Sequence, residues 1–217
     1  MLIRKSSSVR IKRVESRSRA LIVTLQDKEN CAAIMYVCSV HLDADRSTDS
    51  QRREHHQKQR QSQLKSLLKR INFACKLDKQ VIKEAPILIA GDFNMLRENP
   101  LHKSLVEGSL TTSPNAFVTL YDAYLQAERH KRYSTPAYCD ELQHGSKKKL
   151  KTPNKDQHLV KTYKGGAILD YIYTSEKVKV IDTLLYHPKS SIKGIEFWPN
   201  EKHPSDHLPI GIDFEWN

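Results

Sequence analysis

Residues 86–94 combine a short apolar run with an abrupt polar end. The run Ile87-Leu88-Ile89-Ala90 follows a proline and stops at Gly91-Asp92-Phe93-Asn94. Consecutive apolar residues between Pro and Gly predict a strand that is buried on both faces. Sheets flanked by helices place ligands beyond the carboxyl ends of their strands, so Asp92 and Asn94 are candidate functional residues. The same residues suit an ordinary turn, because Asp and Asn bond their own backbone, and both interpretations stay open at this point.

The chain before this run predicts a hairpin and a basic N-terminal strand. Residues 20–25 and 33–40 are rich in β-branched side chains and flank a polar turn, and the second of them runs into His41. Residues 1–19 carry seven Lys or Arg against one acid, which also suits a mitochondrial transit peptide. The near-alternating Val9, Ile11 and Val14 favour the strand instead.

A helical pattern follows a polar stretch that we expect to be a loop at 43–53. Apolar residues at 64, 67, 68, 71 and 75 recur at helical spacing and predict one amphipathic helix that packs on the sheet. Its basic side is most simply a solvated face, and a phosphate-tracking role is the alternative. Further on, the sequence predicts helices over 100–106 and 117–125, and strands over 167–174, 178–181 and 210–214.

Charge is the compositional property that bears most on partners. The formal net charge of +11 favours polyanions, with nucleic acid first and anionic membrane surfaces or small phosphorylated molecules after it. No apolar run approaches the length of a membrane span. Cys31, Cys38, Cys75 and Cys139 form no C-x-x-C pair, so we interpret all of them as small buried hydrophobes of an intracellular protein in the cytoplasm or nucleus.

Residues 126–164 differ in composition from the rest of the chain. They are polar and rich in lysine, with two prolines and few bulky apolar side chains. A segment of this length inside one domain is typical of a functional loop or a disordered one. We expect a mobile basic insertion, whose lysines either contact a phosphate backbone or are merely solvated.

Polar motifs on or beside the predicted strands occur in a characteristic order. They are Val40-His41-Leu42, Gly91-Asp92-Phe93-Asn94, Leu169-Asp170-Tyr171-Ile172 and Ser205-Asp206-His207-Leu208-Pro209. Together they resemble the endonuclease/exonuclease/phosphatase superfamily, which has the deoxyribonuclease-I-like fold. Three further runs are most similar to the branch of nocturnin, angel and the Ccr-Not deadenylase: Leu120-Tyr121-Asp122-Ala123-Tyr124, the Gly-Gly-x-Ile-Leu-Asp-Tyr-Ile-Tyr segment, and Trp198-Pro199-Asn200.

The resemblance implies catalytic roles for three residues. His207 would accept or relay the proton of the attacking water, and Asp170 would fix its tautomer. His41 would donate to a phosphate oxygen. Each also has a plainer interpretation: a turn for the Asp-His pair of the last motif, a structural hydrogen bond for Asp170, and a satisfied strand-end histidine for His41.

The resemblance also implies a metal. Asp206 is its candidate ligand for Mg²⁺ or Mn²⁺, which prefer oxygen donors. Asp92 and Asn94 would either orient the attacking water or hold a second metal ion, and the sequence does not choose between these two roles.

These expectations define a fold and a function. We expect a single domain over residues 1–217, an α/β/β/α four-layer sandwich that lacks its N-terminal portion, because the family's metal-binding Glu has no match here. The implied activity is Mg²⁺- or Mn²⁺-dependent hydrolysis of phosphodiesters in nucleic acid, above all single-stranded RNA at a 3′ end. The alternatives are a phosphatase or sphingomyelinase-type lipid phosphodiesterase, and a non-catalytic nucleic-acid-binding remnant.

Overall fold

The architecture is a mixed α/β sandwich built around a six-stranded sheet. The computed structural model describes residues 8–45, 48–110, 118–130, 168–184, 199 and 204–216. Six strands form the large sheet in the order β1-β2-β3-β4-β6-β5, and β7 pairs with β8 in a second sheet. The elements are β1 (Val9–Ser16), β2 (Ala20–Asp27), β3 (Ile34–His41), α1 (Ser50–Leu77), the 3-10 helix η1 (Ile82–Glu84), β4 (Ile87–Asp92), α2 (Pro100–Val106), β5 (Tyr121–Asp122), α3 (Ala123–His130), β6 (Asp170–Thr174), β7 (Val178–Thr183) and β8 (Ile212–Trp216).

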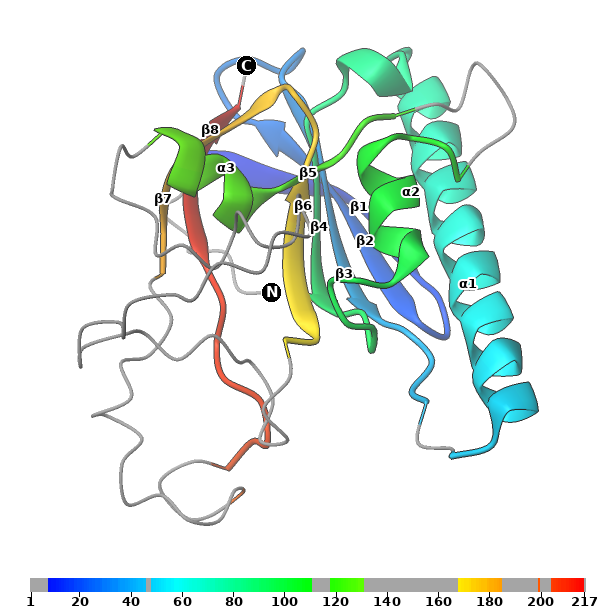
Figure 1. Cartoon of the computed structure of the whole chain (residues 1–217). Coiled ribbons are helices and arrows are strands. Elements are labelled where there is room, and N and C mark those ends of the chain that lie inside the picture. Colours follow the sequence, from blue (N-terminus) through cyan, green and yellow to red (C-terminus); the bar gives the residue numbers. More distant parts are fainter. Residues whose placement is uncertain are drawn as a thin grey trace, which may run out of the picture.

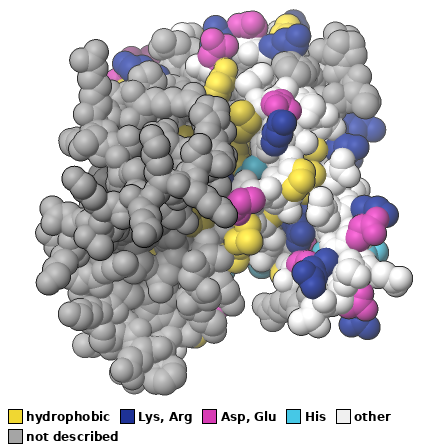
Figure 2. Space-filling view, in the orientation of Figure 1, with side chains coloured by type: hydrophobic (Ala, Val, Ile, Leu, Met, Phe, Trp, Pro, Cys, Tyr) yellow, Lys and Arg dark blue, Asp and Glu magenta, His cyan; other side chains and the backbone are white. Residues whose placement is uncertain are grey.

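The layers follow the expected order. In Figure 1, α1 and α2 cover one face of the six-stranded sheet, and β7, β8 and α3 lie on its other side. The predicted α/β sandwich is therefore confirmed. The surface view in Figure 2 shows Lys and Arg side chains of the described residues beside Asp and Glu, without a broad field of one sign on this face. None of the helices in the described ranges is both long and apolar enough to span a membrane.

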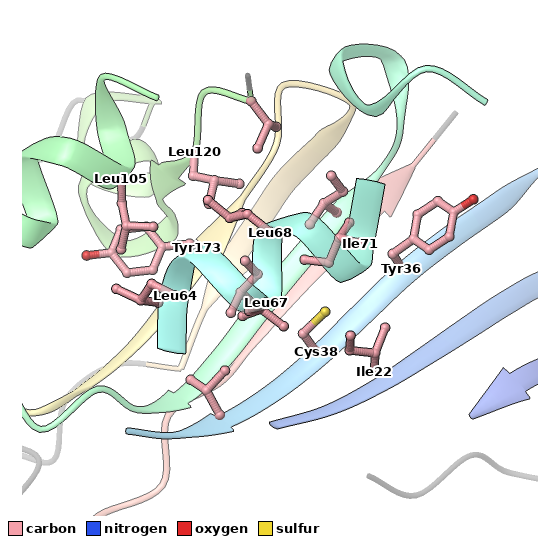
Figure 3. Close-up of a cluster of buried hydrophobic side chains, with 14 of the residues drawn as sticks. Ile22, Tyr36, Cys38, Leu64, Leu67, Leu68, Ile71, Leu105, Leu120 and Tyr173 are labelled. Atoms are coloured by element: carbon pink, nitrogen blue, oxygen red, sulfur yellow. The ribbon is translucent and has the colours of Figure 1, made fainter. Parts of the chain in front are cut away.

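Two apolar clusters hold the layers together. Leu64, Leu67 and Ile71 of α1 lie over Tyr36 and Ile22 of the sheet (Figure 3). Burial of each such side chain contributes about 1.5–3 kcal/mol. The second cluster lies on the opposite face of the sheet, where side chains of β2, β3, β4 and β6 meet β7 and β8.

Strand β4 contributes to both clusters. Ile87 and Ile89 belong to the cluster beneath α1, and Leu88 belongs to the one facing β7 and β8. Successive side chains of a strand point to opposite faces, so a run without polar residues suits a strand covered on both sides. The prediction of a strand buried on both faces is confirmed.

The helix α1 begins earlier than its apolar pattern indicates. It starts at Ser50, so the expected loop at 43–53 is wrong over its last residues. Asp49 is the N-cap, and its side chain accepts hydrogen bonds from the backbone N–H groups of Gln51 and Arg52 at 2.8 and 3.3 Å. The first turns carry Gln, Arg and Glu, which form helices readily but leave no apolar periodicity in the sequence.

Smaller differences from the sequence predictions concern element boundaries and one cysteine. The helix expected over 117–125 is wrong at Tyr121–Asp122, which pair with β6 as β5 before α3 begins. The last strand starts at Ile212 and not at 210. Cys38 and Cys75 are buried as expected, whereas Cys31 is exposed in the turn between β2 and β3, which corrects the expectation for that residue.

Several predicted features lie outside the described residues. These are Cys139, Gly165-Gly166, Trp198, Asn200 and nearly all of the lysine-rich segment 126–164, of which only the first residues, within α3, are described.

The predicted basic strand β1 is held to the rest of the molecule by a buried carboxylate. Asp78, just after α1, has a side chain only 1% exposed and pairs with Lys12 and Arg13 of β1 at 2.8 and 2.7 Å. It also accepts a hydrogen bond from the Tyr36 hydroxyl at 3.0 Å. Burial alone would raise the pKa of Asp78, but the hydrogen bonds of Lys12 and Tyr36 and the charge of Arg13 outweigh it and lower the pKa.

Candidate active site

Three strand ends meet at one edge of the large sheet. Strand β3 runs parallel to β4 and places His41 opposite Asp92. Strand β6 runs antiparallel to β4 and begins at the same edge, with Asp170 opposite Asp92. The pairing thus brings together side chains that are far apart in the sequence, since neighbouring strands lie about 4.7–4.9 Å apart.

The turn after β4 fixes Asp92 by its own hydrogen bonds. Oδ1 of Asp92 accepts from the backbone N–H of Asn94 at 2.8 Å, and Nδ2 of Asn94 donates to the backbone oxygen of Leu42 at 3.0 Å. Asn94 has a φ of 49°, a left-handed conformation that Asn tolerates better than most residues. The motif is therefore a turn, and this turn ties the ends of β3 and β4 together.

Gly91 is required by the close contact between these two strands. Its φ is +139°, and a Cβ atom at this position would lie 2.1 Å from the backbone oxygen of Val40. No side chain fits such a gap, so the residue before Asp92 must be glycine. The close approach of backbone to backbone sets the position of the neighbouring carboxylate.

His207 joins the cluster from the loop that precedes β8. Its Nδ1 atom lies 2.7 Å from Oδ2 of Asp170, and its Nε2 atom lies 3.7 Å from Oδ2 of Asp92. His41 approaches the same Asp92 oxygen with its Nε2 atom at 3.8 Å. Two imidazole Nε2 atoms thus flank one carboxylate oxygen. Both separations exceed a direct hydrogen bond and suit a water or a substrate oxygen between the groups.

The electrostatics of the cluster follow from partial burial and closely spaced charges. Burial raises the pKa of Asp92, with a further contribution from the charge of Asp170. For His207, burial alone lowers the pKa, but the hydrogen bond to Asp170 and the charges of Asp170, Asp92 and Asp206 outweigh it, so the pKa is raised. The imidazolium of His207 is therefore stabilised by the acids around it.

The oxygen donors suit a hard cation, but they form an incomplete set. Asp206 lies next to His207, and its carboxylate makes no hydrogen bond or ion pair with another described residue. It lies in the segment before β8, outside the regular strands. Within the described ranges, no three Asp, Glu, His or Cys side chains converge on one point that could hold a metal. Mg²⁺ can bind through one or two carboxylates with water and substrate oxygens, so Asp206 and Asp92 fit it only in that manner.

A neighbouring cluster was missed by the sequence analysis. A groove of about 690 Å³ is lined by Arg19, His41, Asp43, Ala44, Thr48, Arg52 and His56. Arg19 ends the basic segment 1–19, Arg52 lies in the segment expected to be a loop, and His56 precedes the apolar pattern of the predicted helix. The one signal for it is the density of Arg and His over residues 52–56, which by itself also suits a solvated helix.

Sequence comparison finds one curated relative with a similar segment and no matching family model. Carbon catabolite repressor protein 4 homolog 4 of Arabidopsis thaliana is 30% identical over 131 residues, which is 59% of this chain and 27% of that protein. The chain thus spans about a quarter of the length of this relative.

Structure comparison finds more extensive likeness. The human Nocturnin catalytic domain, solved with a bound sulfate anion, has a TM-score of 0.56 at 19% identity over 97% of this chain and 61% of that chain. ANGEL2, described as a 2',3'-cyclic phosphatase, has a TM-score of 0.53 at 18% identity over 97% of this chain and 68% of that one. An endonuclease/exonuclease/phosphatase from Bacteroides vulgatus has a TM-score of 0.50 at 14% identity, with coverage of 97% and 67%.

Proposed function

We propose, from the premise that this chain has the deoxyribonuclease-I-like fold of the endonuclease/exonuclease/phosphatase superfamily, that it hydrolyses phosphodiesters in nucleic acid. One observation carries the proposal. His41, Asp92, Asp170 and His207 converge at one edge of the large sheet, with the Asp170–His207 hydrogen bond already formed. A histidine oriented by a carboxylate and aimed at a second polar group is the arrangement that general acid–base chemistry needs.

The residues divide the work of hydrolysis between them. Asp170 accepts the Nδ1–H of His207, so the Nε2 atom of His207 faces Asp92 and can take a proton. A water between this Nε2 and Asp92 would attack phosphorus and lose its proton to His207, as the bond from phosphorus to the leaving oxygen breaks. His41, whose side chain is 68% exposed, would donate to a non-bridging oxygen.

The proposed activity includes a divalent metal ion. Asp206 and Asp92, with Asn94 beside them, are the residues that would hold Mg²⁺ or Mn²⁺ together with water and substrate oxygens. When bound, the ion would neutralise charge on the phosphate oxygens.

Single-stranded RNA is the substrate we propose. The support is the net charge of +11 and the likeness to nocturnin and to the carbon catabolite repressor homologue. Because ANGEL2 is described as a 2',3'-cyclic phosphatase, cyclic phosphate ends of RNA belong among the test substrates. A lipid phosphodiester is the competing substrate class.

A second candidate function is a non-catalytic nucleic-acid-binding remnant. The observation that favours it is the incomplete donor set, since no three metal-binding side chains converge within the described residues. Such a protein would bind RNA with a steep salt dependence but would not cleave it.

The test is an assay of the purified chain with Mg²⁺, with Mn²⁺ and with EDTA. Substrates are single-stranded RNA, single-stranded DNA, a nucleoside 2',3'-cyclic phosphate, inositol phosphate and a phospholipid. We expect metal-dependent cleavage of RNA that is lost in the His207→Ala variant, while RNA binding is retained. Binding of RNA without cleavage would support the non-catalytic remnant. Preferred hydrolysis of phospholipid or inositol phosphate would contradict the nuclease and support a phosphatase or lipid phosphodiesterase.

A further inference from the structure

The groove lined by Arg19, Asp43, Arg52 and His56 is continuous with the candidate active site. His41 belongs to both, because it lines the groove while its Nε2 atom lies 3.8 Å from Asp92. A polynucleotide strand that continues past His41 from the reacting phosphate therefore enters the groove. The groove is a shallow, open depression rather than an enclosed cavity.

Asp43 is fixed on the wall of this groove by its backbone and its side chain. Its N–H donates to Oε1 of Gln63 at 3.0 Å, and its carbonyl oxygen accepts from the buried Arg60 at 3.1 Å. Both partners come from α1. The segment after β3 is thus attached to the helix at a defined place, although it has no regular secondary structure.

The carboxylate of Asp43 orients two side chains of the groove, one from directly before β2 and one from α1. Oδ1 lies 3.4 Å from the guanidinium of Arg19, and Oδ2 lies 2.5 Å from Nδ1 of His56. The Asp43 carboxylate thus contacts both Arg19 and His56 and holds both side chains at the wall of the groove. Side chains held in this way lose less conformational freedom on binding than unrestrained surface side chains do.

Arg52 gives the groove an excess of positive charge. Its guanidinium makes no hydrogen bond or ion pair with another described residue, and the side chain is exposed. The lining holds two arginines against one aspartate, and the two histidines add charge when protonated. Arginine presents donors in a planar fork that matches phosphate oxygens.

We propose that this groove binds a second phosphate of the same polynucleotide, next to the one that is hydrolysed, through Arg52 and Arg19. Asp43 and His56 are positioning residues for Arg19. The inference rests on the proposed function for the identity of the ligand, and it deepens it: the site would take a chain with at least two phosphates rather than a lone phosphate ester.

The experiment measures binding of a short single-stranded RNA, a fluorescein-labelled trinucleotide, to the full chain in EDTA, over a range of salt concentrations. We expect Arg52→Ala to weaken binding roughly 3- to 10-fold at low salt, and to reduce the salt slope by about one phosphate contact. The matched control is Lys69→Ala, which removes one exposed charge from the same helix but not from the groove. Circular dichroism verifies that both variants are folded.

A second readout separates this inference from the proposed function. In Arg52→Ala, KM for the RNA is expected to rise by a larger factor than KM for bis(p-nitrophenyl) phosphate, which has one phosphate. Equal losses of RNA affinity in Arg52→Ala and Lys69→Ala, or wild-type affinity in Arg52→Ala, would contradict phosphate binding in the groove. Neither result would affect the proposed hydrolase activity. Absence of hydrolysis by the wild type, with the expected binding difference, would overturn the hydrolase alone.

Discussion

Oδ2 of Asp170 accepts a hydrogen bond from Nδ1 of His207 at 2.7 Å, although 37 residues separate them in the chain. In Asp170→Asn the side chain keeps its size but loses the charge that orients the imidazole and stabilises its protonated form. Because general acid–base catalysis contributes typically 10²–10⁴-fold, we expect turnover of RNA to fall by about this factor. Steady-state kinetics measure the effect.

The matched control for this prediction is Asp213→Asn, an exposed acid of β8 outside the site. It should leave both turnover and thermal stability unchanged. Equal turnover in Asp170→Asn and the wild type would contradict the proposed role of Asp170 in orienting His207.

Gly91→Ala is expected to destabilise the fold by more than about 2 kcal/mol. The added Cβ would lie 2.1 Å from the Val40 backbone oxygen, at a φ that L side chains rarely adopt. Urea unfolding measures the change. Gly211→Ala is the control, since its Cβ would lie 3.5 Å from Leu184, an ordinary contact. A Gly91→Ala protein as stable as the Gly211→Ala protein would contradict the β3–β4 geometry.

Asp78→Ala is expected to lower the free energy of unfolding by about 2–3 kcal/mol. The change removes the acidic partner of Lys12 and Arg13 and the acceptor of the Tyr36 hydroxyl, and the partial exposure of Lys12 and Arg13 limits the loss. The measurement is chemical denaturation. Hydrogen exchange of β1 amides should increase most, because Asp78 ties this edge strand to the molecule. Asp213→Ala serves as the control, and uniform exchange across the sheet would argue against the tie.

His102 predicts a specific pH dependence of stability. Burial lowers its pKa from 6.5 to about 4, so the unfolded chain takes up a proton well before the folded one. The unfolded state therefore binds more protons between pH 6.5 and 4, and stability falls as pH drops through this window, by about 3 kcal/mol in total.

The pH profile of the difference between wild type and His102→Gln isolates this contribution from the titrating carboxylates. The wild type should lose stability relative to the variant as pH falls from 6.5 to 4. His55→Gln, on the exposed start of α1, provides the comparison. A difference that does not change with pH would show that His102 does not titrate with a lowered pKa.

Sequence patterns predicted the elements that are apolar on a regular period. The unbroken run Ile87–Ala90 indicated burial on both faces because both faces of β4 are covered, and the leucines of α1 marked its contact with the sheet. The motif residues His41, Asp92, Asp170 and His207 were predicted from family resemblance. Strand pairing brings the first three together and the loop before β8 adds His207, and no local pattern specifies either.

Other parts had no local signal. The first turns of α1 are polar throughout, so only the Asp49 cap marks their start. Strand β5 consists of two residues, and its pairing with β6 overrides their helical surroundings. The contact of Asp43 with His56 depends on where the start of α1 lies relative to the end of β3, which the sequence pattern does not determine.

The pairing of β4 with β6 makes the proposed activity depend on correct alignment of the sheet. Asp170 faces the cluster only because it is paired with Asp92, and a shift of β6 by one residue would turn its carboxylate to the opposite side of the sheet. A misaligned molecule could still bury much of its apolar surface and pass a test for compactness. Specific activity per folded molecule would then report the fraction of a preparation whose central strands are correctly aligned.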